Sequence, residues 1–248
     1  MSLRERADDL RELMDDPACD PVRLRRTIER FAIVNRLVAG WDAVYRRHVR
    51  PALAGLSRPV RVLDIGCGGG DVLRRVVALA REDGHSVEAL GIDPDGRAIE
   101  VARAGEASPG LRFRQAYSHD LVAEGEVFDV VVSNHLLHHL GDGERAGLFA
   151  DTERLAERVA VHSDIHRSRT AYAAYAVAIT PLAPGSFLRT DGLRSIRRSH
   201  TREELAALVP PGWTVERRGF RVVAVHRPWA DGEVEPGPES AVDGERGA

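Results

Sequence analysis

The chain has 248 residues, of which 43% are hydrophobic and 29% charged, values that are ordinary for a soluble globular protein with one elaborated α/β domain or two small ones. The net charge of -3 gives no overall attraction to nucleic acid or to an anionic membrane, and no apolar run is long enough to span a bilayer, so neither partner is expected. All 35 basic residues are arginine, which excludes a Walker-A phosphate loop, a Schiff-base enzyme and a lysine general base.

The first 58 residues are expected to form a helical cap. Residues 3–16 have a charged, amphipathic pattern that is expected to be helical. Asp20 followed by Pro21 is a start signal for a second helix, and apolar residues then recur at helical spacing as far as Val49. This apolar face fits two roles, packing against the sheet or forming a lid over an active site.

With only two cysteines in the chain, a disulfide framework is excluded and a cytoplasmic location is the default.

A buried strand over residues 60–65 runs into a glycine loop and then into a helical pattern. Gly66 and Gly68 fit a dinucleotide-type loop, in which glycines let the backbone approach a ligand closely, but Asp71 replaces the third glycine of that fingerprint. Asp64 would repel a pyrophosphate, whereas it is complementary to a ligand that carries an ammonium and a sulfonium group. The loop therefore favours a cationic ligand.

The second strand, residues 87–92, ends at Asp93 and Pro94. An acidic residue at the tip of this strand is typical of a site for ribose hydroxyls. Asp95 is expected to cap the helix that follows, which leaves Asp93 for the ribose. This feature indicates a nucleoside and does not say which one.

A third strand is expected at residues 111–115, and a fourth, at residues 128–133, leads into Asn134 and three histidines. His135 and His139 are an i, i+4 pair, which is compatible with a metal site, but neither a third ligand nor an HExxH-type base is evident. No metal is therefore predicted. His138 and His139 are interpreted as hydrogen-bonded packing at a helix start, and His135, directly beyond the strand, as the more exposed candidate.

The C-terminal part is expected to hold a fifth strand at residues 159–163, a substrate-lid insertion at residues 165–200 and, after a helix that a capping box opens, a hairpin. The insertion contains His166 and several arginines that either clamp an acidic group or form a solvated loop; these are Arg189, Arg194, Arg197 and Arg198. The tail, residues 229–248, has the composition of a disordered segment.

Residues 63–70 resemble motif I of the class I S-adenosylmethionine-dependent methyltransferases, and residues 128–140 resemble motif IV of the same family. The resemblance extends over residues 20–227. It implies an α/β, Rossmann-like, seven-stranded, mostly parallel sheet with a terminal antiparallel hairpin. It also implies transfer of a methyl group from S-adenosyl-L-methionine to a small molecule, in the manner of the quinone-biosynthesis and polyketide-tailoring enzymes.

The resemblance assigns Asp64 to the ammonium group or the loop, Asp93 to the ribose and Asn134 to the methionine part of the cofactor. Tyr117 and Ser118 stand where many family members have an Asp-Ala pair at the adenine, which is a departure from the pattern. The full set of expected cofactor contacts is Asp64, Gly66, Gly68, Asp93, Pro94, Tyr117, Ser118 and Asn134. For a phenolic, enolic or carboxylic acceptor, His135 is the first candidate for a base and His166 the second, because histidine titrates near neutral pH.

Two other classes stay open at this point. One is a nicotinamide-dependent oxidoreductase on a related sheet, and the other is an RNA-directed or non-catalytic S-adenosylmethionine-binding protein that uses the arginines of the insertion. The expected partner is a small molecule, with an acidic group left open, and the sequence identifies neither this methyl acceptor nor the oligomeric state.

Overall fold

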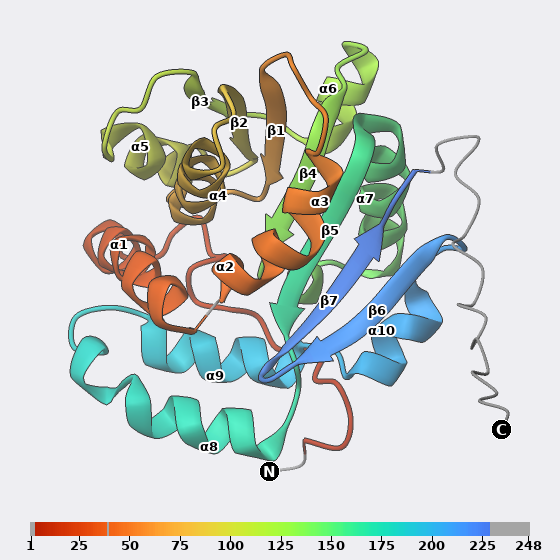
Figure 1. Ribbon diagram of the computed structural model, residues 1–248. Coiled ribbons are helices and arrows are strands. Elements are labelled where there is room, and N and C mark those ends of the chain that lie inside the picture. Colours follow the sequence, from red (N-terminus) through yellow and green to blue (C-terminus); the bar gives the residue numbers. More distant parts are fainter. Residues whose placement is uncertain (1–2, 39, 229–248) are drawn as a thin grey trace, which may run out of the picture.

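The centre of the molecule is a seven-stranded sheet with the strand order β3-β2-β1-β4-β5-β7-β6 (Figure 1). The computed structural model describes residues 3–38 and 40–228. The parallel strands are β1 (Val60–Ile65), β2 (Val87–Asp93), β3 (Leu111–Gln115), β4 (Phe128–Asn134) and β5 (Ala156–Ile165). The strands β6 (Trp213–Arg218) and β7 (Arg221–His226) form an antiparallel hairpin, and β7 pairs antiparallel with β5. The predicted sheet and its terminal hairpin are confirmed.

Helices cover both faces of this sheet, because side chains alternate between its two sides. Val60 and Val62 of β1 pack into one hydrophobic cluster, and Leu63 and Ile65 pack into the other. The first face is covered by α2 (Trp41–Val44), the π-helical turn η1 (Tyr45–Val49), α3 (Arg50–Ala52), α4 (Asp71–Glu82) and α5 (Gly96–Ala104). The second is covered by α6 (Ser118–Ala123), α7 (Asp142–Leu155) and α10 (Arg202–Leu208).

A third group of helices lies beyond the carboxyl ends of the parallel strands (Figure 1). It comprises α1 (Pro21–Val38), α8 (Arg169–Ala178), the 3₁₀ turn η3 (Thr180–Leu182) and α9 (Leu188–Arg198), while the short turn η2 (Leu137–His139) follows β4. Asp20 caps α1 as predicted, since its carboxylate accepts the backbone N–H groups of Val22 and Arg23 at 2.8 and 3.1 Å. Ligands of open α/β sheets bind at this edge, so these helices form a roof over the expected site.

The helix predicted for residues 3–16 is wrong, because these residues form turns and irregular chain. Their backbone N–H groups bond to distant partners instead: Ala7 donates to the carbonyl of Arg197 at 3.1 Å, and Leu13 donates to the carboxylate of Asp191 at 2.9 Å. The arginines placed in a loop of the insertion lie on or next to α9, which the sequence reading missed.

The capping box of Thr201 and Glu204 at α10 is confirmed. The predicted disordered tail lies outside the described residues. Within the described part of the chain, no helix has both the length and the apolar character needed to cross a membrane.

Candidate active site

The glycine loop leaves an open backbone surface at the carboxyl end of β1. Gly66 and Gly68 adopt left-handed φ angles of 70° and 51°, which favour glycine. The backbone N–H groups of Gly66 and Cys67 donate to the carbonyl of Ile92 at 2.8 and 2.9 Å, which fixes the loop on β2. No atom lies within 4 Å of the place where a Cβ of Gly68 would stand, so the backbone there faces open space. That space is a cavity of about 410 Å³, the roof of which includes α1, α8 and α9.

Asp64 is a buried carboxylate. It is only 1% exposed, and neither of its carboxylate oxygens has a hydrogen-bond partner in the described part of the chain. Burial and the charges of Asp71 and Asp93 raise the pKa of Asp64 well above its ordinary value. Since Asp64 also lines the cavity, its oxygens are ready to accept from a cationic donor in that cavity.

Asp93 ends β2 and holds the loop from the other side. One of its oxygens accepts the N–H of Gly68 at 3.0 Å, and the other accepts the N–H of Asp95 at 2.9 Å. Burial raises the pKa of Asp93, and both Asp93 and Pro94 line the cavity. The carboxylate of Asp95 accepts the N–H of Arg97 and caps α5, as predicted.

Asn134 and His135 close the cavity beyond β4. The side-chain oxygen of Asn134 accepts from the indole N–H of Trp41 at 3.1 Å, a contact that ties the cap to the sheet. His135 is the only described non-glycine residue with a positive φ, 56°, and its N–H donates to the carbonyl of Ser163 at 2.9 Å. Burial lowers the pKa of His135 to about 4, against the opposing charge of Asp164, so the imidazole is neutral at pH 7.

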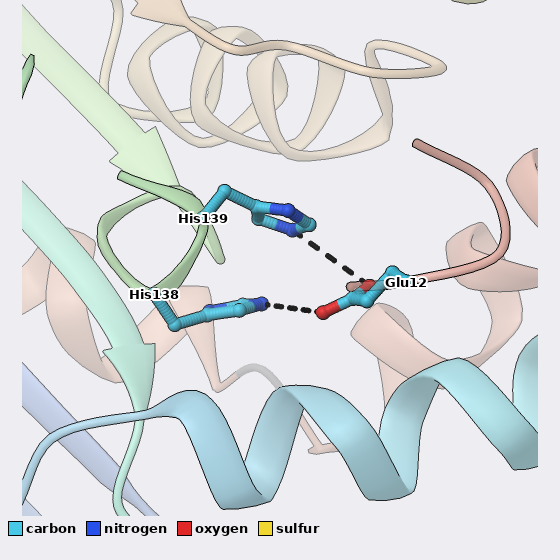
Figure 2. A group of neighbouring side chains, drawn as sticks. All are labelled: Glu12, His138 and His139. Carbon is cyan, nitrogen blue, oxygen red and sulfur yellow. Dashed lines mark ion pairs between the residues drawn. The ribbon is translucent and has the colours of Figure 1, made fainter. Parts of the chain in front are cut away.

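A cluster of Glu12, His138 and His139 also lines the cavity (Figure 2). His138 lies between two carboxylates: its Nδ1 is 2.7 Å from Asp164 Oδ1, and its Nε2 is 3.3 Å from Glu12 Oε1. Burial alone would lower the pKa of His138, but Asp164 and Glu12 outweigh it and raise the pKa to about 10. His139 Nε2 is 3.8 Å from Glu12 Oε2.

Comparison with known proteins identifies the region that carries the glycine loop, Asp93 and His135. Residues 62–158 match the family model described as "Methyltransferase domain". Residues 62–158 thus form a class I S-adenosylmethionine-dependent methyltransferase domain. The cofactor of this class is S-adenosyl-L-methionine.

Two curated relatives of the methyltransferase domain are named "Ubiquinone biosynthesis O-methyltransferase". The one from Azorhizobium caulinodans is 35% identical over 134 residues, which are 53% of this chain and 45% of the relative. The one from Methylobacterium sp. is 35% identical over 124 residues, which are 47% of this chain and 45% of the relative. The chain thus spans about half the length of the curated relatives it matches.

Solved structures show the same fold at low identity. The plantazolicin methyltransferase BpumL, in complex with a pentazolic desmethylPZN analog and SAH, aligns with a TM-score of 0.53 at 12% identity, over 82% of this chain and 95% of that chain. The CurJ carbon methyltransferase aligns with a TM-score of 0.55 at 18% identity, over 84% of this chain and 61% of that chain.

Most of the residues predicted for the cofactor meet in the cavity of the methyltransferase, but three predicted site residues do not line it. Tyr117 is 57% exposed and stacks on the ring of His119. The hydroxyl of Ser118 donates to Asp151 at 2.7 Å. His166 is buried, and its backbone N–H donates to the carbonyl of Phe220 at 2.8 Å. The adenine contacts of Tyr117 and Ser118 stay predictions.

The N-terminal segment, residues 3–20, completes the roof of the cavity, although not as the predicted helix. Leu13 and Met14 donate their backbone N–H groups to the two oxygens of Asp191 on α9, at 2.9 and 3.0 Å. Arg194 donates to the carbonyl of Arg11 at 2.7 Å, so at least one arginine of the insertion holds this segment. No local signal marks the segment, because its partners lie more than 170 residues away in the sequence.

Proposed function

We propose that this protein transfers a methyl group from S-adenosyl-L-methionine to an oxygen of a small-molecule acceptor that is phenolic, enolic or carboxylic. The identity of the methyl donor is supported by the buried carboxylate of Asp64, which has no partner among the described residues and lies beside the open backbone of Gly68. A ligand with an ammonium group would satisfy both oxygens of Asp64, so the residues present fit this cofactor. When bound, the cofactor supplies an activated methyl group on a positively charged sulfur.

The residues of this chain would then bind, orient and shield the reactants. We assign the ammonium to Asp64, the ribose hydroxyls to Asp93 and the methionine part to Asn134, all of which line the cavity. A roofed cavity excludes water and holds two reactants in one orientation, which is the main contribution expected of a protein when the donor is already activated. The names of the curated relatives support oxygen as the methylated atom.

His135 is our candidate for the base that removes a proton from the acceptor. It lines the cavity next to Asn134, and its pKa of about 4 keeps it unprotonated and able to accept a proton at pH 7. His166, the second candidate from the sequence, lies outside the cavity-lining set, so the geometry favours His135.

Arg221 does not line the cavity, but its positive charge next to His135 supports an acceptor with an acidic group. Its side chain is 9% exposed, its Nη1 has no hydrogen-bond partner among the described residues, and its charge acts on His135. A buried guanidinium without a carboxylate partner is complementary to an anion. Arg221→Gln should therefore raise the KM for acidic acceptors and leave the thermal shift by cofactor unchanged.

The test has two stages on the full chain. Thermal shift should show stabilisation by S-adenosyl-L-methionine and by its demethylated product, and none by NADH. Incubation with the cofactor and panels of phenolic, enolic and carboxylic metabolites should then give products heavier by one methylene group in the mass spectrum. Stabilisation by NADH alone would contradict the proposed methyl donor. Methylation only at carbon or nitrogen would contradict the proposed oxygen acceptor.

A further inference from the structure

Three side chains that line the cavity bring potential metal ligands together (Figure 2). Glu12 comes from the N-terminal segment, and His138 and His139 come from the turn η2 after β4. One ligand atom of each residue lies within 4.8 Å of those of the other two. Glu12 of the N-terminal segment is thus the third ligand that the sequence around His138 and His139 lacks.

The spacing of these atoms suits a tetrahedral zinc ion. Zinc binds imidazole nitrogen and carboxylate oxygen at about 2.0–2.2 Å, which places neighbouring ligands of a tetrahedron about 3.3–3.6 Å apart. Glu12 Oε1 lies 3.3 Å from His138 Nε2, which is within this range, whereas Glu12 Oε2 lies 3.8 Å from His139 Nε2, so the partly exposed ring of His139 would have to move closer on binding zinc. His138 Nε2 is buried and faces Glu12 Oε1, its ion-pair partner, so this nitrogen points into the cluster.

The surroundings of the cluster are those of a ligated site. Asp164 binds His138 twice, at Nδ1 through Oδ1 (2.7 Å) and at the backbone N–H through Oδ2 (2.9 Å), which fixes the ring with Nε2 facing Glu12. The hydroxyl of Ser195 donates to Glu12 Oε1 at 2.8 Å and orients that carboxylate. Carboxylate–histidine pairs and hydrogen-bonded ligating carboxylates are regular outer partners of zinc.

The charges around the cluster also leave room for a divalent cation. Among the described residues, the one guanidinium that pairs with the carboxylates of Glu12, Asp15 and Asp164 is that of Arg198, which lies 3.5 Å from Asp15 and 4.0 Å from Glu12. Zinc would bind the imidazoles in their neutral form and would therefore release the proton that His138 carries between Asp164 and Glu12. In that form, two negative charges lack a partner within this group. A zinc ion on the two imidazoles and Glu12 would balance them.

We propose that Glu12, His138 and His139 bind a zinc ion, with a fourth position open to the cavity. Two imidazoles and one carboxylate with an open position are the donor set of many catalytic zinc sites. Its use here, binding an oxygen of the methyl acceptor, rests on the proposed function, whereas binding of the ion does not. The acceptor class it favours is one that ligates a metal through a phenolate, enolate or carboxylate oxygen.

The test is direct metal binding by the full-length protein after removal of metals with a chelator. Zinc is added in competition with a chromophoric chelator, and the wild type should bind one ion per chain. His139→Asn and Glu12→Gln should each weaken binding at least tenfold. His85→Asn, a histidine before β2 at the opposite edge of the sheet, is the matched control and should bind as the wild type does. Cobalt should give the intense visible absorption of a four-coordinate site in the wild type and in His85→Asn alone.

Two results would overturn the site: no zinc bound by the wild type at equimolar concentration, or equal binding by the wild type and His139→Asn. His139 keeps 25% of its side chain exposed, so His139→Asn should fold even if Glu12→Gln does not, and thermal unfolding verifies this. The shift by S-adenosyl-L-methionine is measured in parallel. Loss of that shift with zinc still bound would count against the proposed function and leave the metal site intact.

Discussion

Replacing Asp64 by asparagine should weaken cofactor binding and stabilise the protein without cofactor. In the absence of ligand, the carboxylate is buried, has no hydrogen-bond partner and lies near the acidic groups of Asp71 and Asp93. Asparagine removes a buried carboxyl group whose ionisation the folded chain disfavours, while the cofactor loses its anionic partner. One substitution should thus move the two measurements in opposite directions, as expected where stability is sacrificed for binding.

The magnitudes follow from the contacts of Asp64. A hydrogen bond to a charged group contributes about 1.5–3 kcal/mol, so the Kd for S-adenosyl-L-methionine should rise roughly 10- to 150-fold. Removing the buried charge should stabilise the protein by about 1 kcal/mol, which corresponds to an increase in Tm of about 2–4 °C for a chain of this size.

The pH dependence has a definite sign. Because the pKa of Asp64 is higher in the folded than in the unfolded chain, its native form retains a proton that the unfolded form has lost. This contribution to the free energy of unfolding is therefore most favourable at low pH and is lost as pH rises above the unfolded pKa of about 4. The stability difference between Asp64→Asn and the wild type should grow over the same range.

The assay is isothermal titration calorimetry for Kd together with scanning calorimetry of the ligand-free protein, and Asp129→Asn is the control. Asp129 is equally buried but fully paired, since it accepts from Arg58 at 2.7 and 2.8 Å and from the N–H of Arg61 at 2.8 Å. Asp129→Asn should lower Tm and preserve Kd. If Asp64→Asn changes Kd less than twofold, or lowers Tm as Asp129→Asn does, the reasoning about Asp64 fails.

The remaining predictions concern the base, the cap and the roof. His135→Ala should keep cofactor affinity and lower kcat by about 10²–10⁴-fold, with His166→Ala close to the wild type; the reverse pattern in steady-state kinetics would exchange their roles. Tyr45→Phe removes the 2.8 Å hydrogen bond to Asp83 and should cost about 1 kcal/mol in urea unfolding, so an unchanged midpoint would show that this bond is not stabilising. Asp191→Ala should speed hydrogen exchange in the N-terminal segment about tenfold or more, with the sheet unaffected, and equal exchange would mean that other contacts hold the segment.

Local chemistry made much of this fold predictable. Alternation and glycine placed the strands, and the caps at Asp20 and Thr201 depend on residues at most three positions away. Asp64 and Asp93 could be predicted as cavity residues because parallel strands present their carboxyl ends at one edge. These local features predict the folded conformation correctly because the contacts on which they depend form within one turn or one strand.

Tertiary contacts explain what the sequence could not predict. Residues 3–16 carry a helical pattern, but the N–H groups of Leu13 and Met14 bond to Asp191 of the distant insertion instead. Glu12 contacts His138, which lies 126 positions away in the sequence, and no local spacing predicts that contact. Ser118 has a suitable hydroxyl, yet its direction is set by Asp151 on α7.

The floor and the roof of the cavity come from different parts of the chain. Every residue that we assign to the methyl donor lies within the matched region, residues 62–158, whereas α1, α8, α9 and the N-terminal segment lie outside it. Under the proposed function, substitutions in the roof can alter which acceptor binds, while the residues that bind the methyl donor stay the same. Grafting the roof of a relative onto this floor would then redirect the enzyme to a new acceptor, and homologues should diverge fastest where the chain arches over the sheet.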